Sequence, residues 1–319
     1  MVPNSPTPSS SQIESITEAL PPSQFYTWRG YRCAYELYVP DNPTADSGIP
    51  LVLLHPIGVG LSRYFWHRFC RQWRKTGHNN PIYNPDLLGC GESEMPRAAY
   101  RPTDWAEQLH YFLQTIVKQP VILLVQGAEL PVALALVQRQ AEPNYIQGLV
   151  LSGPPAWSLI TTGTPAWQNK LSWNILDSPV GSAFYRYARR RQFLRSFSER
   201  QLFAQSSQID AQWLDTLEDG AVNLDSRYAV FSFLAGFWRE NYENAIASIS
   251  QPTLVVVGEK ASSISRKGKS ETPEERITQY LKHLPRGQGR KISGRNVLPY
   301  ESTDEFVEVA AEFAKAISS

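Results

Sequence analysis

The sequence lacks both a hydrophobic run long enough to cross a membrane and an excess of charge of one sign. Its longest aliphatic run is Val121–Val125, whereas a membrane-spanning helix needs about 18 or more apolar residues. Lys and Arg number 31 against 30 Asp and Glu, which leaves a net charge of +1. This balance provides no general attraction to nucleic acid or to acidic membranes, so we expect no nucleic-acid partner.

Cysteine is scarce, and the few cysteines lie far apart. Cys33, Cys70 and Cys90 form neither a disulfide framework nor a metal-binding spacing, which favours a reducing compartment such as the cytoplasm. The five histidines are scattered, and no glycine-rich loop matches a phosphate-binding motif. We therefore expect no metal and no cofactor. The beginning of the chain lacks the basic start and apolar run of a signal peptide.

What is present is a regular alternation of short apolar runs with segments of helical periodicity. Of 319 residues, 42% are hydrophobic and 19% are charged, which suits a folded globular core. The predicted elements are a hairpin over Phe25–Pro40, strands over Ile49–Leu54, Pro81–Pro85, Val121–Val125, Ile146–Leu151, Thr253–Val257 and Arg290–Ile292, and helices over Ser62–Trp73, Thr103–Val117, Pro131–Gln140, Pro273–Leu284 and Thr303–Ile317. This alternation is typical of an α/β protein whose parallel sheet is covered by helices on both faces.

Two segments depart from the alternation. Residues 1–22 are rich in Pro and Ser and have no apolar periodicity, which predicts a disordered tail. After residue 154 the strands stop, and the sequence is helical and aromatic until about residue 247. We therefore expect an α/β core formed by residues 23–154 and 248–319, with a helical cap, residues 155–247, inserted between two strands.

Five segments, taken in order, resemble the α/β-hydrolase fold family over about Phe25 to Ile317. They read LVLLHPIGVG, NPDLLGCGESEMP, VILLVQGAELPVALAL, QPTLVVVGEKAS and ISGRNVLPYESTDEFVEVAAEFA. The resemblance implies a mostly parallel sheet flanked by helices, with a cap. The cap and the loop Leu-His-Pro-Ile-Gly-Val-Gly are also similar to hydrolase-like proteins of cyanobacteria and plastids. On that likeness, a plastid stroma is an alternative to the cytoplasm.

The residues that carry the family's chemistry are absent from the matching positions. The family's elbow reads Gly-x-Ser-x-Gly, with the nucleophile on a strained turn, whereas Gln126–Leu130 places Ala128 there. The acid position is Ala261 and the histidine position is Val297. After residue 110 the chain has one histidine, His283, in a predicted helix before the last strand. A Ser–His–acid triad needs a hydroxyl, a base and a carboxylate, so we predict no catalytic residues of the standard kind.

Other side chains near these positions leave alternatives open. Glu129 follows the lost nucleophile; it either serves as a base or, in the interpretation we favour, faces solvent or caps the next helix. His55 begins the predicted oxyanion loop with Ile57 and Gly58, and the family resemblance implies that it braces this loop. Pro56 has no N–H to donate, so only the Ile57 N–H remains as a possible donor.

A cleft between cap and core is expected to be apolar, because the triad positions carry apolar residues. Its predicted walls include Gln126, Leu130, Trp157 and Trp238, and an acyl, isoprenoid or pigment-like molecule would fit them. In the expected cap, basic residues alternate with aromatic ones. The basic residues are Arg186, Arg189, Arg190, Arg191 and Arg195. We interpret this run as a solvated helix face, with an anionic membrane or a protein partner as the alternative contact.

Three functions remain open from the sequence. The leading hypothesis is a non-hydrolytic protein that acts as a scaffold or assembly factor, or that binds an apolar ligand. The second is an esterase or lyase of unusual mechanism that uses Glu129. The third is a membrane-surface adaptor that binds through the Arg-rich part of the cap.

Overall fold

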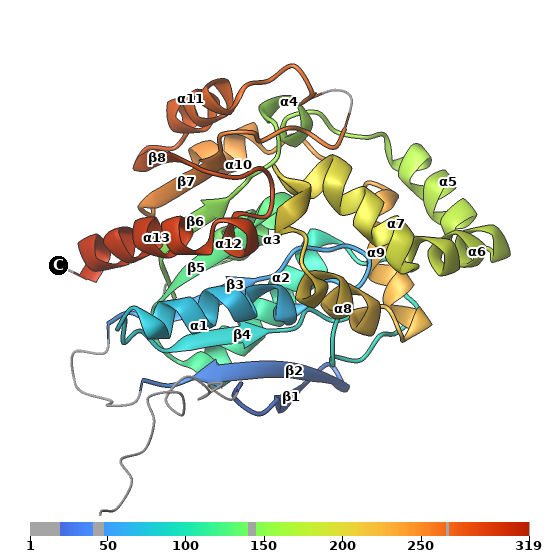
Figure 1. Cartoon of the computed structure of the whole chain (residues 1–319), viewed down its shortest axis with the longest axis horizontal. Helices are drawn as coiled ribbons and strands as arrows, with labels where there is room; N and C mark the ends of the chain where they lie inside the picture. Colours follow the sequence, from blue (N-terminus) through green and yellow to red (C-terminus); the bar gives the residue numbers. More distant parts are fainter. Residues whose placement is uncertain (1–19, 41–47, 140–144, 266–267, 319) are drawn as a thin grey trace, which may run out of the picture.

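The computed structural model describes residues 20–40, 48–139, 145–265 and 268–318. The predicted tail therefore lies almost entirely outside the described residues. One eight-stranded sheet crosses the core in the order β1-β2-β4-β3-β5-β6-β7-β8 (Figure 1). Strands β1 and β2 are antiparallel, β2 is antiparallel to β4, and the remaining neighbours are parallel. The predicted parallel sheet is confirmed.

The strands and helices follow one another along the chain in the predicted order. The strands are β1 (Gln24–Trp28), β2 (Tyr31–Tyr38), β3 (Leu51–Leu54), β4 (Ile82–Pro85), β5 (Val121–Gln126), β6 (Ile146–Ser152), β7 (Thr253–Gly258) and β8 (Gly287–Ile292). The helices flanking the sheet are α1 (His67–Lys75), α2 (Pro102–Phe112), α3 (Leu130–Arg139), α11 (Pro273–His283), α12 (Leu298–Glu301) and α13 (Thr303–Ser318). The helices between β6 and β7 are α4 (Trp157–Ile160), α5 (Ala166–Leu176), α6 (Pro179–Ala188), α7 (Arg191–Phe197), α8 (Ala211–Gly220), α9 (Arg227–Leu234) and α10 (Glu243–Ala247).

Strand β5 shows why continuous apolar runs become central strands. Val121, Leu123 and Val125 join the core on the face covered by α2, α3 and α11. Ile122 and Leu124 join the opposite core, which α1 and α13 cover. Because successive side chains of a strand point to opposite faces, a strand buried on both faces must be apolar at every position.

Two of the differences between the predicted and the observed boundaries have a local explanation. The second helix begins at Pro102 rather than at a Thr103 cap, because Asp104 accepts the Arg101 N–H at 2.8 Å and proline suits a first helical position. Strand β8 is twice as long as predicted and begins at Gly287. The first half of this strand was missed because its glycines give no apolar pattern in the sequence. The packing needs these glycines, since a Cβ on Gly289 would stand 2.4 Å from Ile277 Cγ2 of α11.

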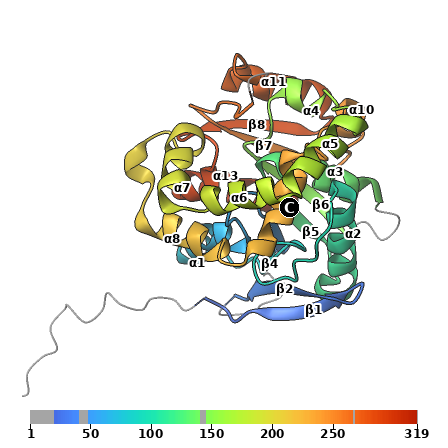
Figure 2. The ribbon, with the colours of Figure 1, turned by 90° about the vertical axis from the view of Figure 1, so that its right-hand side faces the viewer.

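The regular elements between β6 and β7 are helices joined by turns and loops, with no strand among the described residues, as predicted. Helices α5 to α9 gather on one side of the core, on the right in Figure 1, and face the viewer in Figure 2. The loop after β3 packs directly on α8, since a Cβ on Gly60 (φ +75°) would lie 1.9 Å from the Leu217 carbonyl oxygen. Whether residues 155 and 247 bound a separate cap stays a prediction.

Candidate functional site

The sharp turn that follows β5 lies at the carboxyl edge of the parallel strands, where α/β sheets place their ligands. Strand β5 ends at Gln126, one short 3₁₀ turn follows, and α3 begins at Leu130. Within this turn the backbone takes a positive φ, +61°, at Gly127. The next residue is Ala128. Neither side chain carries an oxygen or sulfur atom that could attack a carbonyl.

The third residue of the turn, Glu129, points inward. It is only 2% exposed, and its carboxyl group lies near the backbone of Ile57, which favours the charged form. Burial raises the pKa of Glu129 to about 8, and the Ile57 backbone offsets only part of that rise. The expectation that Glu129 faces solvent is therefore wrong: it lies beside Phe233 and Trp238, against the loop that follows β3.

Aromatic side chains fill the space in front of Glu129. Tyr100 and Trp105 stack with centroids 5.5 Å apart, and Phe233 and Trp238 stack at 5.4 Å. They leave a cavity of about 10 Å³ beside Glu129, room for about one water molecule. The roomy apolar cleft that the sequence predicted is not found at this place among the described residues, because these rings pack against each other instead of lining a void.

The four predicted pocket residues do not come together. Trp238 lines the small cavity. Leu130 is buried in the core beneath the sheet edge. Trp157 packs against α11 instead, with its ring stacked on His283 at a centroid distance of 4.4 Å. The fourth, Gln126, reaches a neighbouring loop.

The loops after β5, β7 and β8 do meet at the carboxyl edge of the sheet. Gln126 Nε2 donates to the Asn296 carbonyl at 2.7 Å, and Asn296 Nδ2 donates to the Ser262 carbonyl at 2.9 Å. Ala261 and Val297, the predicted acid and histidine positions, are the direct neighbours of these residues, and both are buried. The bonds that Gln126 and Asn296 make here run between amides and carbonyls, which neither store nor transfer a proton at neutral pH. Arg295 also joins the loops after β7 and β8, since its Nε donates to Ser262 Oγ at 3.0 Å.

His55 is fully buried and braces the loop after β3. Its Nε2 accepts the Leu87 N–H at 3.1 Å, so the proton is on Nδ1, which donates to the Pro56 carbonyl at 3.0 Å. Burial lowers the pKa of His55, which keeps the ring neutral. Gly58 closes the loop by accepting the Leu61 N–H at 3.1 Å. Both nitrogens of His55 serve the backbone, as the bracing interpretation expects.

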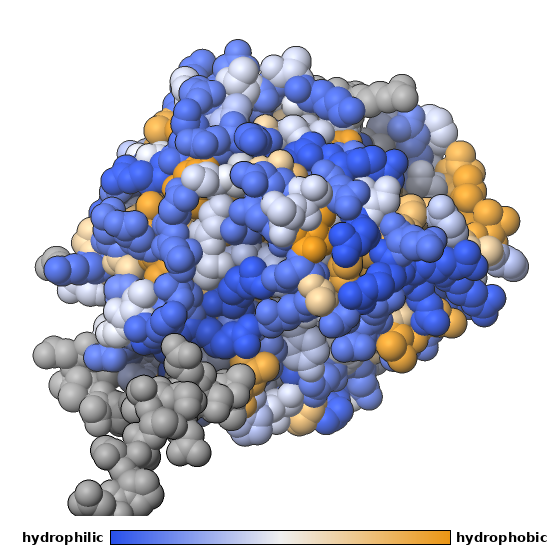
Figure 3. Space-filling model, viewed as in Figure 1, coloured by the Kyte–Doolittle hydropathy of each residue, from blue (hydrophilic) through white to orange (hydrophobic). Residues whose placement is uncertain are grey.

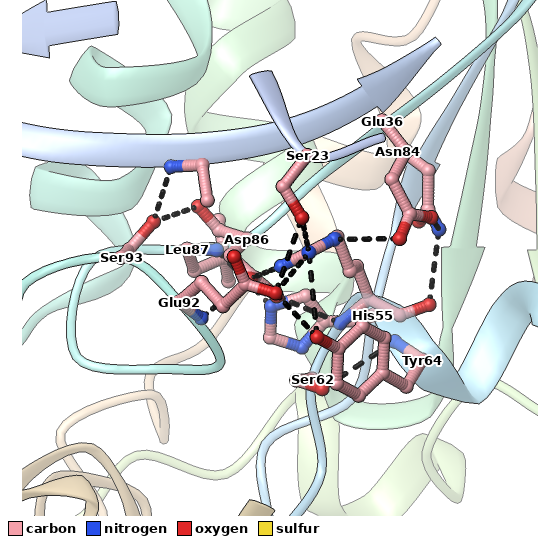
Figure 4. Close-up of polar contacts among 12 residues, drawn as sticks. Ser23, Glu36, His55, Ser62, Tyr64, Asn84, Asp86, Leu87, Glu92 and Ser93 are labelled. Carbon is pink, nitrogen blue, oxygen red and sulfur yellow. Dashed lines mark hydrogen bonds and ion pairs between the residues drawn. The ribbon is translucent and has the colours of Figure 1, made fainter. Parts of the chain in front are cut away.

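A buried ion network next to His55 was not predicted from the sequence (Figure 4). The Arg63 guanidinium has no exposed surface and forms ion pairs with Asp86, with Glu36 at 3.1 Å and with Glu92 at 2.8 Å. His67 Nε2 lies 2.9 Å from Glu36. Burial opposes the ionisation of Glu36, yet His67 and Arg63 together hold its pKa below the ordinary value. The network ties the loops after β3 and β4 to the edge hairpin.

A sequence profile described as the alpha/beta hydrolase family matches residues 51–309, which is most of the chain. The protein belongs to the α/β hydrolase family. Solved structures agree on the fold. An esterase from Thermogutta terrifontis is 16% identical with a TM-score of 0.69, covering 93% of this chain and 100% of the esterase. An enol-lactonase from Burkholderia xenovorans is 14% identical with a TM-score of 0.68, covering 92% and 100%. At such identities the likeness establishes the fold alone.

Curated relatives of this α/β hydrolase add little about its activity. Uncharacterized proteins of Mycobacterium tuberculosis and Mycobacterium bovis are 27% identical over 171 residues, which is 53% of this chain and 44% of theirs. The chain thus spans less than half the length of the curated relatives it matches.

The Cys90 thiol of this hydrolase-fold chain lies in surroundings that keep it unreactive. Burial, with Asp86 and Glu129 nearby, raises the pKa of the Cys90 thiol well above its usual value, so it stays protonated. Within the described residues, no three His, Cys, Asp or Glu side chains are placed to hold a metal ion. No helix in the same residues is long and apolar enough to cross a membrane.

The Arg-rich part of the cap is used partly within the molecule. Arg189 donates to the carbonyls at the end of α8, and Arg191 forms ion pairs with Asp215 at 2.6 Å and with Glu218. The remaining three, Arg186, Arg190 and Arg195, are exposed. The predicted solvated face is therefore only part of the run.

Proposed function

We propose that this α/β-hydrolase-fold chain is a non-hydrolytic member of its family that acts as a scaffold or assembly factor. The observation that supports this most is the buried Glu129 carboxyl, which lies against the backbone of Ile57. In α/β-hydrolases, one oxyanion-hole N–H comes from the loop after the third strand, the loop in which Ile57 lies. A substrate carbonyl would have to displace a buried side chain from this place.

The turn after β5 supports the same proposal. The residue with the positive φ is Gly127, a conformation that glycine adopts without strain, and the family nucleophile occupies the corresponding corner of this turn. We therefore assign the nucleophile position to Gly127, one residue before Ala128. Either assignment leaves the corner without a hydroxyl or thiol group.

Between the two forms of the leading hypothesis, the small cavity favours a scaffold over a ligand binder. A drug-sized or acyl ligand needs a pocket of roughly 300 Å³ or more, whereas the space beside Glu129 is about 10 Å³. An acyl-sized ligand therefore does not fit beside Glu129, and the partner that we propose is a macromolecule. A location in the cytoplasm or a plastid stroma, and a likeness to cyanobacterial and plastid proteins, remain predictions.

One observation favours a second candidate function, an atypical hydrolase or lyase. Glu129 is a buried carboxyl beside a cavity, and its pKa of about 8 lies near a working pH. Carboxyl groups with raised pKa values serve as general acids and bases in enzymes. In this candidate, Glu129 would activate the single water that the cavity can hold.

Hydrolysis of activated short- and medium-chain esters by the purified protein tests both candidates. The variants are Glu129→Gln and, as a matched control, Glu312→Gln, which changes an exposed glutamate of α13. Each protein is also treated with a fluorophosphonate probe, which labels activated serines. We expect no turnover above buffer and no label on any of the three.

Two results would contradict the scaffold proposal. Turnover that disappears in Glu129→Gln but persists in Glu312→Gln would establish the second candidate. Turnover or labelling that is equal in all three proteins would require a nucleophile outside this turn and would refute both candidates.

A further inference from the structure

Helix α5 exposes an apolar stripe and contributes no fully buried residue to the molecule. Trp167, Leu171 and Ile175 recur at four-residue spacing, which places them on one side of the helix. They are 65%, 52% and 55% exposed. Large apolar side chains are ordinarily solvent-exposed only singly, so three in a row on one helix are an unpartnered face.

Helix α6 continues this face. Val180, Phe184 and Tyr187 share one side of the helix, and Val180 is 70% exposed. The stripes of the two helices meet at the turn, where Ser178 Oγ donates to the Ile175 carbonyl at 2.6 Å. In Figure 3 hydrophobic side chains gather at the right-hand edge of the molecule, where Figure 1 places α5 and α6.

The hairpin of α5 and α6 holds these stripes in a set geometry. Gly181 lies so close to α5 that a Cβ on it would stand 1.8 Å from the Leu176 carbonyl oxygen. Tyr185, on the inner side of α6, is fully buried, and its hydroxyl lies 2.7 Å from Ser226 Oγ. The inner side of the hairpin is thus packed on the protein while the outer apolar side faces solvent.

The exposed charged groups that α5 and α6 themselves carry are positive. Lys170 on α5 and Arg186 on α6 are exposed, and Arg190 follows at the end of α6. The one acidic residue between 166 and 190 is Asp177, and it is already bound by Arg97 Nη2 at 2.9 Å. The apolar face therefore has a cationic border without a free carboxylate on either helix.

We propose that the outer face of the α5–α6 hairpin docks on a lipid bilayer that carries anionic headgroups. Helices that lie in the membrane interface combine aromatic and aliphatic side chains on one face with cationic side chains at its border. The apolar stripes enter the boundary of the acyl chains, and the cationic border binds the headgroups. This inference does not depend on whether the β5–α3 turn is catalytic.

The positive border also argues against a second copy of the chain as the occupant. A two-fold contact through this face would bring the same patch of each copy together. Lys170 and Arg186 of one copy would then face the same residues of the other copy, and like charges repel. An anionic surface meets the same border with opposite charge.

Vesicle flotation of the full-length protein tests the proposal, with phosphatidylcholine vesicles and with vesicles containing 30% phosphatidylglycerol. We expect binding to the anionic vesicles that weakens as salt is raised. The variant is Val180→Asp, which puts a charge in the apolar face and should lower the vesicle partition coefficient by at least about tenfold. Val180 lies in the first turn of α6, where an aspartate suits the helix dipole, so the variant should fold.

The matched control is Val39→Asp, at an exposed valine on the opposite end of the sheet. Val39 follows Tyr38, which pairs with Ile82, the first residue of β4. Val39 therefore lies at the amino edge of the parallel strands, whereas α5 and α6 follow the carboxyl end of β6. The control should bind anionic vesicles like the unmodified protein. Lys170→Ala combined with Arg186→Ala should weaken binding to anionic vesicles by roughly thirtyfold.

Three results would overturn the proposal. One is the absence of binding to anionic vesicles at low salt. Another is an equal effect of Val180→Asp and Val39→Asp. The third is a dimer in sedimentation velocity that Val180→Asp dissociates, because the face would then join two copies of the chain.

Discussion

The buried carboxyl of Glu129 should make the stability of this protein depend on pH, and Glu129→Gln should remove that dependence. In the fold the pKa of Glu129 is about 8, because burial raises it from an ordinary value of 4.5. Between these values the folded chain holds a proton that the unfolded chain releases. This contribution to stability is complete below pH 4.5 and is lost as the pH rises through 8.

The magnitude follows from these two pKa values. Applying the linkage relation to them, the free energy of unfolding of the unmodified protein should fall by about 2.5 kcal/mol between pH 6 and pH 9 through this group alone. Glutamine has the shape of the protonated acid and carries no charge at any pH. Its carbonyl can occupy the same place beside the Ile57 backbone, so the variant loses the titration without adding a charge.

Urea unfolding at pH 6 and pH 9 of the unmodified protein, Glu129→Gln and Glu312→Gln measures this effect. Other titrating groups are shared by all three proteins and cancel in the differences. We expect the stability of Glu129→Gln, relative to the unmodified protein, to rise by about 2.5 kcal/mol between the two pH values. Glu312→Gln should show no such rise. A constant difference between Glu129→Gln and the unmodified protein would refute the assignment of a raised pKa to this carboxyl.

Two further predictions concern contacts that hold the loops of the carboxyl edge. Arg63→Ala should lower the free energy of unfolding by about 3–5 kcal/mol at pH 7, because it leaves Asp86 and Glu36 buried without their counter-charge; a loss below about 1 kcal/mol in urea unfolding would show that water replaces the guanidinium. Asn296→Ala should cost about 1–3 kcal/mol, since the Gln201 carbonyl, which accepts from Asn296 Nδ2 at 2.7 Å, loses its donor. Amide hydrogen exchange over residues 198–203 should accelerate in the Asn296 variant, and unchanged rates would contradict the role of this contact.

Local patterns in the sequence were sufficient to predict the strands and their common sheet. A fully buried strand must be apolar at every position, so Val121–Val125 could be placed in the sheet centre from its residues alone. The turn Arg29-Gly30, with both residues at positive φ, was likewise visible as the corner of a hairpin. Only the second half of strand β8 could be predicted, because Gly287 and Gly289 have no side chain that would give an apolar pattern. Their reason for being glycine is the close approach of α11, which no local pattern contains.

The candidate site divides in the same way. The residue types at the turn after β5 exclude a hydroxyl nucleophile whatever the register, so that absence was determined by the sequence. The direction of Glu129 was not, because a carboxylate beside a helix start ordinarily faces water. Its burial depends on Tyr100, Trp105 and Phe233 of α9, which pack over it from distant parts of the chain. The charge state of the site therefore comes from tertiary packing.

The cap shows the same division. The sequence determined that residues between β6 and β7 form helices rich in aromatic and basic side chains. Only the tertiary structure decided which of these side chains are used internally: Tyr185 packs inward and Arg191 pairs with acids of α8, whereas Trp167 and Val180 remain in solvent. Helical periodicity defines the faces of a helix, but exposure depends on which neighbour covers each face. That neighbour is set by how the chain folds back on itself, and it leaves the outer side of α5 and α6 without one among the described residues.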